Sequence, residues 1–427
     1  MRKFKDRITF WSAVSLGIGG MVGGGIFAVL GLAIELGKGA TPIAFLIGGL
    51  IALITSYSYA KLCVKYPSQG GTVEYLNKAY GNGIFTGAMN VLLWLSYVVM
   101  LSLYSYAFGS YAASVFAPNS WFWKHFFITL IIVAMMILNA LSAEIVGKGE
   151  EILVGLKVGI LLVVVVFAGM WTVNWPRFAT SNWPSLINII AGGMIIFLAY
   201  EGFELIANTA KEIENINDLP KAFYISVLFV IFLYVSIAIV TVGNLSYATI
   251  VKARDYALAM AVKPIFGRAG FLLIVAAALL STGSAINATL YGAARISYII
   301  AKYGELPKFL EKKVWNKPLE GLILTGLITI FFANFFDLTS ISTMGSAGFL
   351  LIFALVNLAN YKLREKTEAN SILAILGFIS CIAALIILVI RVSRISIEKP
   401  LILAFLLGIS FLIEIIYRGL TGREIKL

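Results

Sequence analysis

The sequence predicts an all-α membrane protein with twelve transmembrane helices. Of the 427 residues, 60% are apolar and only 13% are charged, whereas soluble domains average about 25% charged residues. The mean hydropathy is +0.94, and apolar stretches long enough to cross about 30 Å of hydrocarbon recur along the chain. These features exclude an ordinary soluble enzyme and a disordered scaffold.

The twelve predicted spans are separated by polar residues, glycine or proline. An even number of spans puts both termini on the same side of the membrane. The terminal segments and the loops on their side then carry 22 of the 33 Lys and Arg residues, and the positive-inside rule makes this side cytoplasmic. The net charge of +12 therefore reflects orientation, not nucleic-acid binding. The predicted spans are residues 8–35, 40–65, 84–116, 126–143, 150–172, 186–210, 221–245, 269–301, 319–336, 340–361, 370–392 and 399–418.

The first span carries six glycines within residues 17–25. Glycine costs about 1 kcal/mol per residue in a helix interior, so this cluster marks a place where the helix can open. Small residues also allow close helix packing, but the three consecutive glycines at 23–25 favour a break.

The sixth span has Gly192 and Gly193, followed near its middle by Glu201, Gly202 and Glu204. Carboxylates are costly inside a membrane and indicate a functional site. Because the two interrupted helices are the first and the sixth, an odd number of positions apart, they enter the membrane from opposite sides. Helices 1–5 (residues 1–175) and 6–10 (residues 176–364) are therefore predicted to be inverted repeats, with a binding site where the interrupted helices meet.

The chemistry of two such breaks favours a zwitterion. The second half of helix one begins near Gly25, where free N–H groups and the positive dipole end suit a carboxylate. The first halves of both helices end in unpaired carbonyls that suit an ammonium group. An α-amino acid is the simplest ligand with both groups. The predicted acceptors are the carbonyls near Val22, Leu198, Ala199 and Glu201.

Lys157 is the one charged residue in the apolar stretch 152–171. Its ammonium could snorkel to the interface, but Gly155 and Gly159 beside it leave space for another backbone, as a site inside the bundle requires. A lysine removed from water can release its proton at physiological pH, so Lys157 could couple transport to a proton gradient. Glu201 and Glu204 are alternative proton carriers.

Helix eight offers Lys157 a partner region. Its Ser281 and Thr282 hydroxyls lie in an otherwise apolar span, close to Ala278. Such hydroxyls bind other groups in the bundle or bond back to their own helix.

Before this span, residues 248–264 are predicted to form an amphipathic helix lying over the bundle, with a solvated loop as the alternative. The two cysteines are far apart, and the sequence shows no cluster of His, Cys and acidic residues. Both observations argue against a metal site or a catalytic centre.

Four segments in order resemble the amino acid-polyamine-organocation transporters, and the resemblance covers essentially the whole chain. Two departures are Gly24, where Ser or Thr is frequent, and Glu201, where an apolar residue is more common. A third is the sequence Asn-Ile-Asn at 215–217, which lacks the usual Asn-Pro. The segments are 20–27; 66–71 with 75 and 79–81; 197–204 with 211–212 and 219–222; and 294–302 with 304–308.

The resemblance implies a LeuT-type fold with broken helices one and six and two accessory helices in residues 365–427. It implies that the substrate carboxylate binds the amides of Gly23, Gly24, Gly25 and Ile26, and the amine binds the carbonyls of Val22, Leu198, Ala199 and Glu201. In sodium-coupled relatives a cation lies at positions resembling Gly19, Val22, Ala278, Ser281 and Thr282. In proton-coupled members an ammonium group from helix five can replace that cation, which favours Lys157.

The expected function is proton-coupled symport of amino acids by alternating access, with broad specificity. The protein would lie in the cell membrane with both termini in the cytoplasm, and its partners would be amino acids, protons and lipid. It would use no cofactor and no metal, because the proton gradient supplies the energy. The alternatives are exchange of cationic amino acids or polyamines, and an amino-acid-sensing receptor without transport.

Overall fold

The computed structural model describes residues 8–118, 120–141, 145–311, 318–394 and 398–421. In this part of the chain the regular structure is helical, apart from one parallel bridge between Ile8 and Ile213. Ten helical segments are long and apolar enough to cross a membrane, and two shorter apolar helices accompany them. The chain ends that the sequence places in the cytoplasm, 1–7 and 422–427, lie outside the described residues.

The first predicted span forms two helices. The hydroxyl of Thr9 caps α1 (Phe10–Met21) by accepting from the N–H of Ser12. A short turn at residues 22–24 separates α1 from α2 (Gly25–Gly37). The chain then turns at Lys38, which has a φ of +44°, and continues through η2 (Lys38–Ala40) into α3 (Thr41–Lys65).

The other predicted spans in the first half coincide with long helices, and the fifth changes its winding. It begins as α7 (Ile145–Ile160), widens to a π-helix in η3 (Leu161–Phe167), and ends in α8 (Ala168–Met170). The remaining elements of this half are α4 (Thr72–Tyr80), α5 (Ile84–Phe116), α6 (Trp121–Leu141), η4 (Trp175–Phe178) and η5 (Thr180–Asn182).

In the second half, the segment at 248–264 folds as three short pieces where the sequence predicts one amphipathic helix. These are α11 (Tyr247–Lys252), η8 (Arg254–Tyr256) and the start of α12 (Ala257–Lys302). A positive φ of 61° at Gly267 separates this start from the membrane-spanning part of α12, and glycine adopts that conformation without strain. The other elements are α9 (Leu186–Phe197), η6 (Leu198–Thr209), η7 (Ile216–Asp218), α10 (Leu219–Asn244), η9 (Lys308–Glu311), α13 (Leu319–Phe335), α14 (Leu338–Lys362), α15 (Arg364–Thr367), α16 (Ser371–Ser393) and α17 (Glu398–Thr421).

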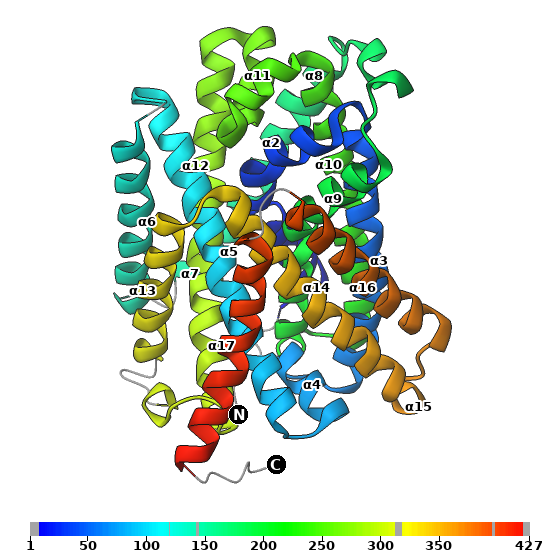
Figure 1. Cartoon of the computed structure of the whole chain (residues 1–427), viewed down its shortest axis with the longest axis vertical. Coiled ribbons are helices and arrows are strands. Elements are labelled where there is room, and N and C mark those ends of the chain that lie inside the picture. The colour runs from blue at the N-terminus through cyan, green and yellow to red at the C-terminus, as the bar shows by residue number, and fades with distance from the viewer. Residues whose placement is uncertain (1–7, 119, 142–144, 312–317, 395–397, 422–427) are drawn as a thin grey trace.

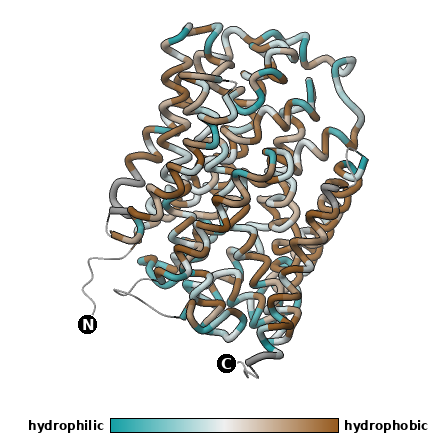
Figure 2. The backbone as a smooth tube through the Cα atoms, turned by 60° about the vertical axis from the view of Figure 1, so that its left-hand side comes forward, coloured by the Kyte–Doolittle hydropathy of each residue, from teal (hydrophilic) through white to brown (hydrophobic). Residues whose placement is uncertain are grey.

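The long helices form one bundle, with α4 and α15 at one end and α8 and α11 at the other (Figure 1). Apolar residues dominate the helices, and hydrophilic residues gather mainly at the two ends (Figure 2). Helices α5 and α14 are almost entirely buried, whereas α6, α16 and α17 expose most of their apolar surface. This exposed apolar surface suits contact with lipid, because lipid tails are as apolar as the side chains themselves.

Candidate functional site

The helix-one break lies deep inside the bundle. α1 ends as the N–H of Val22 bonds the carbonyl of Ile18 at 2.7 Å, and α2 begins at Gly25, where the sequence places the restart. The first turn of any helix has N–H groups without a partner inside the helix. A Cβ at Gly24 would lie 2.2 Å from the ring of Tyr104, so only glycine allows α5 to pack this closely.

Helix six does not open into a gap. α9 ends at Phe197, and the chain tightens directly into η6, a 3-10 helix. Gly192 and Gly193 lie within α9 and do not interrupt it. A Cβ at Gly193 would lie 2.6 Å from the carbonyl oxygen of Ala44, so this glycine lets α9 pack on α3. The change of winding at Leu198 is the feature that corresponds to the predicted break.

The two altered helices touch at the predicted site. A Cβ at Gly25 would lie 2.6 Å from the Cα of Ala199, which places the start of α2 against the start of η6. One turn away, a Cβ at Gly202 would lie 2.2 Å from the carbonyl carbon of Gly20. The structure therefore brings the helix-one and helix-six site residues together. All eight predicted substrate-binding residues are buried: Val22, Gly23, Gly24, Gly25, Ile26, Leu198, Ala199 and Glu201.

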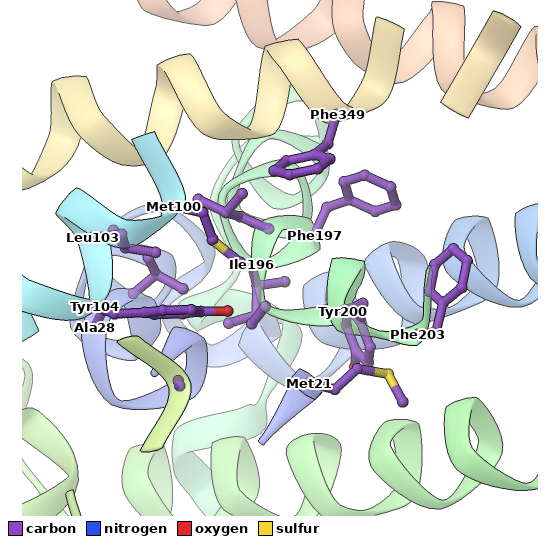
Figure 3. Packing of buried hydrophobic residues seen from close by; sticks show 14 of the residues in the cluster. Met21, Ala28, Met100, Leu103, Tyr104, Ile196, Phe197, Tyr200, Phe203 and Phe349 are labelled. Carbon is purple, nitrogen blue, oxygen red and sulfur yellow. The ribbon is translucent and has the colours of Figure 1, made fainter. Parts of the chain in front are cut away.

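Buried side chains fill the space beside this junction. Met100, Leu103 and Tyr104 reach it from α5, and Ile196 and Phe197 reach it from α9 (Figure 3). Phe349 of α14 packs edge-on against Tyr97, with the ring centroids 5.7 Å apart. Apolar and aromatic walls therefore surround the polar backbone groups of the two helices.

The hydroxyl of Ser281 in α12 reaches across to the break. It donates to the carbonyl of Val22 at 2.7 Å, and it also contacts the carbonyl of Gly23. Thr282, the next residue, bonds back to Ala278 of its own helix at 2.7 Å. Of the two alternatives for these hydroxyls, Ser281 therefore follows the first and Thr282 the second.

Tyr234 of α10 links both altered helices and was missed by the sequence reasoning. Its hydroxyl lies 2.6 Å from the carbonyl of Met21 and 3.4 Å from that of Ala199. It is one of several tyrosines in apolar spans, so its sequence carries no signal that separates it from an ordinary core tyrosine. It fixes the end of α1 relative to the start of η6.

Lys157 points into the bundle. Its side chain is 3% exposed, and its ammonium lies 3.1 Å from the carbonyl oxygen of Gly19 in the last turn of α1. Snorkelling is therefore wrong for this structure. The expectation that another backbone packs against Gly155 and Gly159 was also wrong. A Cβ at either glycine would meet no described atom within 4 Å. The close approach is made instead at Gly19, where a Cβ would lie 2.6 Å from Val154.

Two buried carboxylates follow one another along η6. In a 3-10 helix, residues three apart lie on the same face, so Glu201 and Glu204 share one side. Oε2 of Glu204 accepts from the hydroxyl of Tyr59 at 2.9 Å and from that of Thr72 at 3.4 Å. Glu204 thereby joins η6 to α3 and α4. Glu201, one turn closer to the break, makes no such contact with its Oε2 among the described residues.

Charged residues form ion pairs between α2, α6 and η8 at the end of the molecule where α11 lies. Arg254 pairs with Glu35 of α2 at 3.8 Å, and Lys124 of α6 pairs with Asp255 at 3.5 Å. A Cβ at Gly31 of α2 would lie 2.2 Å from the carbonyl oxygen of Arg254. The segment η8 therefore lies directly against α2.

Comparisons with known proteins agree on one family. Residues 8–412 match the family model described as amino acid permease. The chain is 38% identical over 360 residues to protein MJ0609 of Methanocaldococcus jannaschii, covering 84% of this chain and 82% of that protein. It is 35% identical over 364 residues to the inner membrane transport protein YbaT of Escherichia coli, covering 84% of each. It is 27% identical over 375 residues to cationic amino acid transporter 2 of Arabidopsis thaliana, covering 82% of this chain and 58% of that protein.

Proposed function

The chain belongs to the amino acid permease family of the amino acid-polyamine-organocation superfamily, and from this premise we propose that it takes up amino acids together with protons. Its relatives are transporters and not enzymes. We place it in the cell membrane with both termini in the cytoplasm, on the charge asymmetry of its loops. The proposed fold is the LeuT-type arrangement, with repeats at residues 1–175 and 176–364 and accessory helices in 365–427.

The proposed substrate site is the junction of α2 with η6. The N–H groups of Gly23 to Ile26 would receive the α-carboxylate, because the positive end of the α2 dipole points there. The carbonyls of Val22, Leu198, Ala199 and Glu201 would receive the α-ammonium. Those of Val22 and Ala199 already accept hydrogen bonds from Ser281 and Tyr234. A carbonyl oxygen has a second lone pair, so that of Val22 can still accept from the substrate, whereas that of Ala199 would have to give up its bond within the 3-10 helix η6 or its bond to Tyr234.

The observation that carries proton coupling is the contact between Lys157 and Gly19. The protonated amine holds α7 against the last turn of α1 through a charge-assisted hydrogen bond. Loss of the proton removes the charge that the carbonyl stabilises, and so weakens the link between α7 and α1. Because α1 leads directly into the substrate site, binding and release of this proton would alter the site. The small residues and hydroxyls of α12, including Ala278, Ser281 and Thr282, would form the facing wall of the coupling site.

Uptake into proteoliposomes tests this function. The purified protein is reconstituted without sodium, an inward proton gradient is imposed, and labelled amino acids are added outside. We expect accumulation above equilibrium that a protonophore abolishes. Uptake that requires sodium and ignores the pH gradient would disprove proton coupling. Binding of amino acids without any flux would instead identify a receptor.

Exchange of cationic amino acids or polyamines is the second candidate. It is favoured by the two buried carboxylates on η6 and by the relatives in Arabidopsis thaliana that are named cationic amino acid transporters. Liposomes preloaded with unlabelled lysine distinguish the two modes. An exchanger takes up labelled lysine only when an internal substrate is present, whereas a symporter needs only the proton gradient.

A further inference from the structure

Glu201 has a buried carboxylate oxygen that no described residue satisfies. The side chain is 3% exposed, and Oε2 is shielded from solvent without a hydrogen-bond partner among the described residues. A buried polar group without a partner costs about 1–3 kcal/mol, and more when it is charged. A buried group of this kind calls for an explanation, such as a ligand, an ion or an ordered water that completes its hydrogen bonds. A partner from outside the chain would remove this cost.

The neighbouring carboxylate provides an internal comparison. Glu204 lies one turn further along the same face of η6 and is equally buried. It is anchored through Oε2 by the hydroxyls of Tyr59 and Thr72, which belong to α3 and α4. Glu204 therefore has a structural role that Glu201 lacks. Among the described residues, hydroxyl donors reach Oε2 of Glu204, whose Oε1 has no partner, and none reaches Oε2 of Glu201.

The position of Glu201 relates it to the substrate site. It follows Ala199, whose Cα adjoins Gly25 at the start of α2. Glu201 is two residues further along η6 and is buried, so it lies beside the contact between the two altered helices and not at a separate surface.

We propose that the Glu201 carboxylate binds the positively charged side chain of the substrate, so that the preferred substrates are cationic amino acids such as lysine, arginine and ornithine. This inference rests on the proposed transport function. The α-ammonium group is a less suitable partner, because backbone carbonyls at the helix junction are available for it. A glutamate carboxylate stands a full side chain away from its own backbone carbonyl, and so addresses a second, more distant cation of the substrate.

Lysine and norleucine form the decisive substrate pair, because they share the α-amino acid and the unbranched hydrocarbon chain and differ in the terminal ammonium. Uptake and competition are measured in proteoliposomes for the wild type, Glu201→Gln and Glu204→Gln. We expect the wild type to prefer lysine, and Glu201→Gln to weaken lysine about 10- to 100-fold while norleucine changes little. Glu204→Gln is the matched control, expected to change both substrates by the same factor.

Three results would overturn the inference: a wild type without preference for lysine, an equal loss of both substrates in Glu201→Gln, or a lysine-selective loss in Glu204→Gln. Glu201→Asp keeps the charge but withdraws it by one methylene group, so lysine preference should fall between that of the wild type and that of Glu201→Gln. This variant decides the question if the glutamine variant does not fold. Lysine binding to detergent-solubilised protein is measured in parallel. A wild type that binds lysine through Glu201 but moves no amino acid refutes the transport function and leaves this inference standing.

Discussion

The ammonium group of Lys157 in α7 lies 3.1 Å from the carbonyl oxygen of Gly19 in α1, where almost no solvent reaches it. Gly19 is in the last turn of α1, and the helix ends at Met21. The contact therefore connects a titratable side chain of one helix with the backbone that leads into the proposed substrate site. A charged donor on a buried carbonyl makes a stronger hydrogen bond than a neutral donor does.

Replacing Lys157 with alanine is expected to abolish proton-driven uptake, because no proton then alters the contact between α7 and α1. Substrate binding is expected to survive, since the N–H groups and carbonyls at the α2–η6 junction remain. Uptake under a pH gradient and binding in detergent measure the two effects separately. Lys302→Ala, at an exposed position at the end of α12, is the control for loss of a positive charge. Normal gradient-driven accumulation by Lys157→Ala would refute the coupling role.

Ser281→Ala and Thr282→Ala form a matched pair. The first removes the donor to the carbonyls of Val22 and Gly23 at the break. A buried carbonyl left unsatisfied costs about 1–3 kcal/mol, which corresponds to about a 5- to 150-fold loss if it falls on substrate binding. The second removes only a bond within α12 and should cost less. Equilibrium binding of labelled substrate compares them, and a larger loss for Thr282→Ala would contradict the role of Ser281.

Gly202→Ala is expected to destabilise the protein. Its Cβ would lie 2.2 Å from the carbonyl carbon of Gly20 and 2.4 Å from the amide nitrogen of Met21, and backbone atoms cannot turn aside as side chains do. Overpacking of this kind costs about 1–3 kcal/mol. Gly283→Ala in α12 is the control, because its Cβ would meet no described atom within 4 Å. The melting temperature of the purified protein should fall for the first variant and not for the second.

Glu305 is expected to make the stability of the protein depend on pH. It follows the end of α12, is fully buried, and accepts a 2.8 Å hydrogen bond from the amide of Asn90. Burial raises the pKa of Glu305 from 4.5 to about 7, opposed by that hydrogen bond. Since the folded pKa exceeds the unfolded one, the contribution to stability is complete below about pH 4.5 and is lost as the pH rises through 7.

Replacing this group with glutamine should remove the dependence. Between pH 5 and 8 the wild type is expected to lose about 2–3 kcal/mol of stability relative to Glu305→Gln, whose side chain stays neutral. Melting temperatures of both proteins over this range measure the difference. Parallel pH profiles for the two proteins would show that folding does not raise the pKa of Glu305.

The local predictions succeeded where composition alone imposes a structure. Three consecutive glycines weaken a helix wherever they stand, and α2 does begin at Gly25. The pair at 192 and 193 could not be assigned in the same way, because glycine serves close packing and helix breaking alike. Only the position of Ala44 beside Gly193 shows that packing explains this glycine. Residues 248–264 divide at Ala253 and after Tyr256, at positions that amphipathicity does not reveal.

The sequence by itself determined that the chain is a helical membrane protein, where its apolar spans lie, and that Lys157, Glu201 and Glu204 are the exceptional charges within them. Those conclusions follow from the cost of placing charges and unpaired backbone groups in hydrocarbon. The tertiary structure decided which groups these charges meet. Lys157 meets Gly19, 138 residues away, and Glu204 meets Tyr59, 145 residues away. Helix packing selects such partners, and the pattern along one span does not record them.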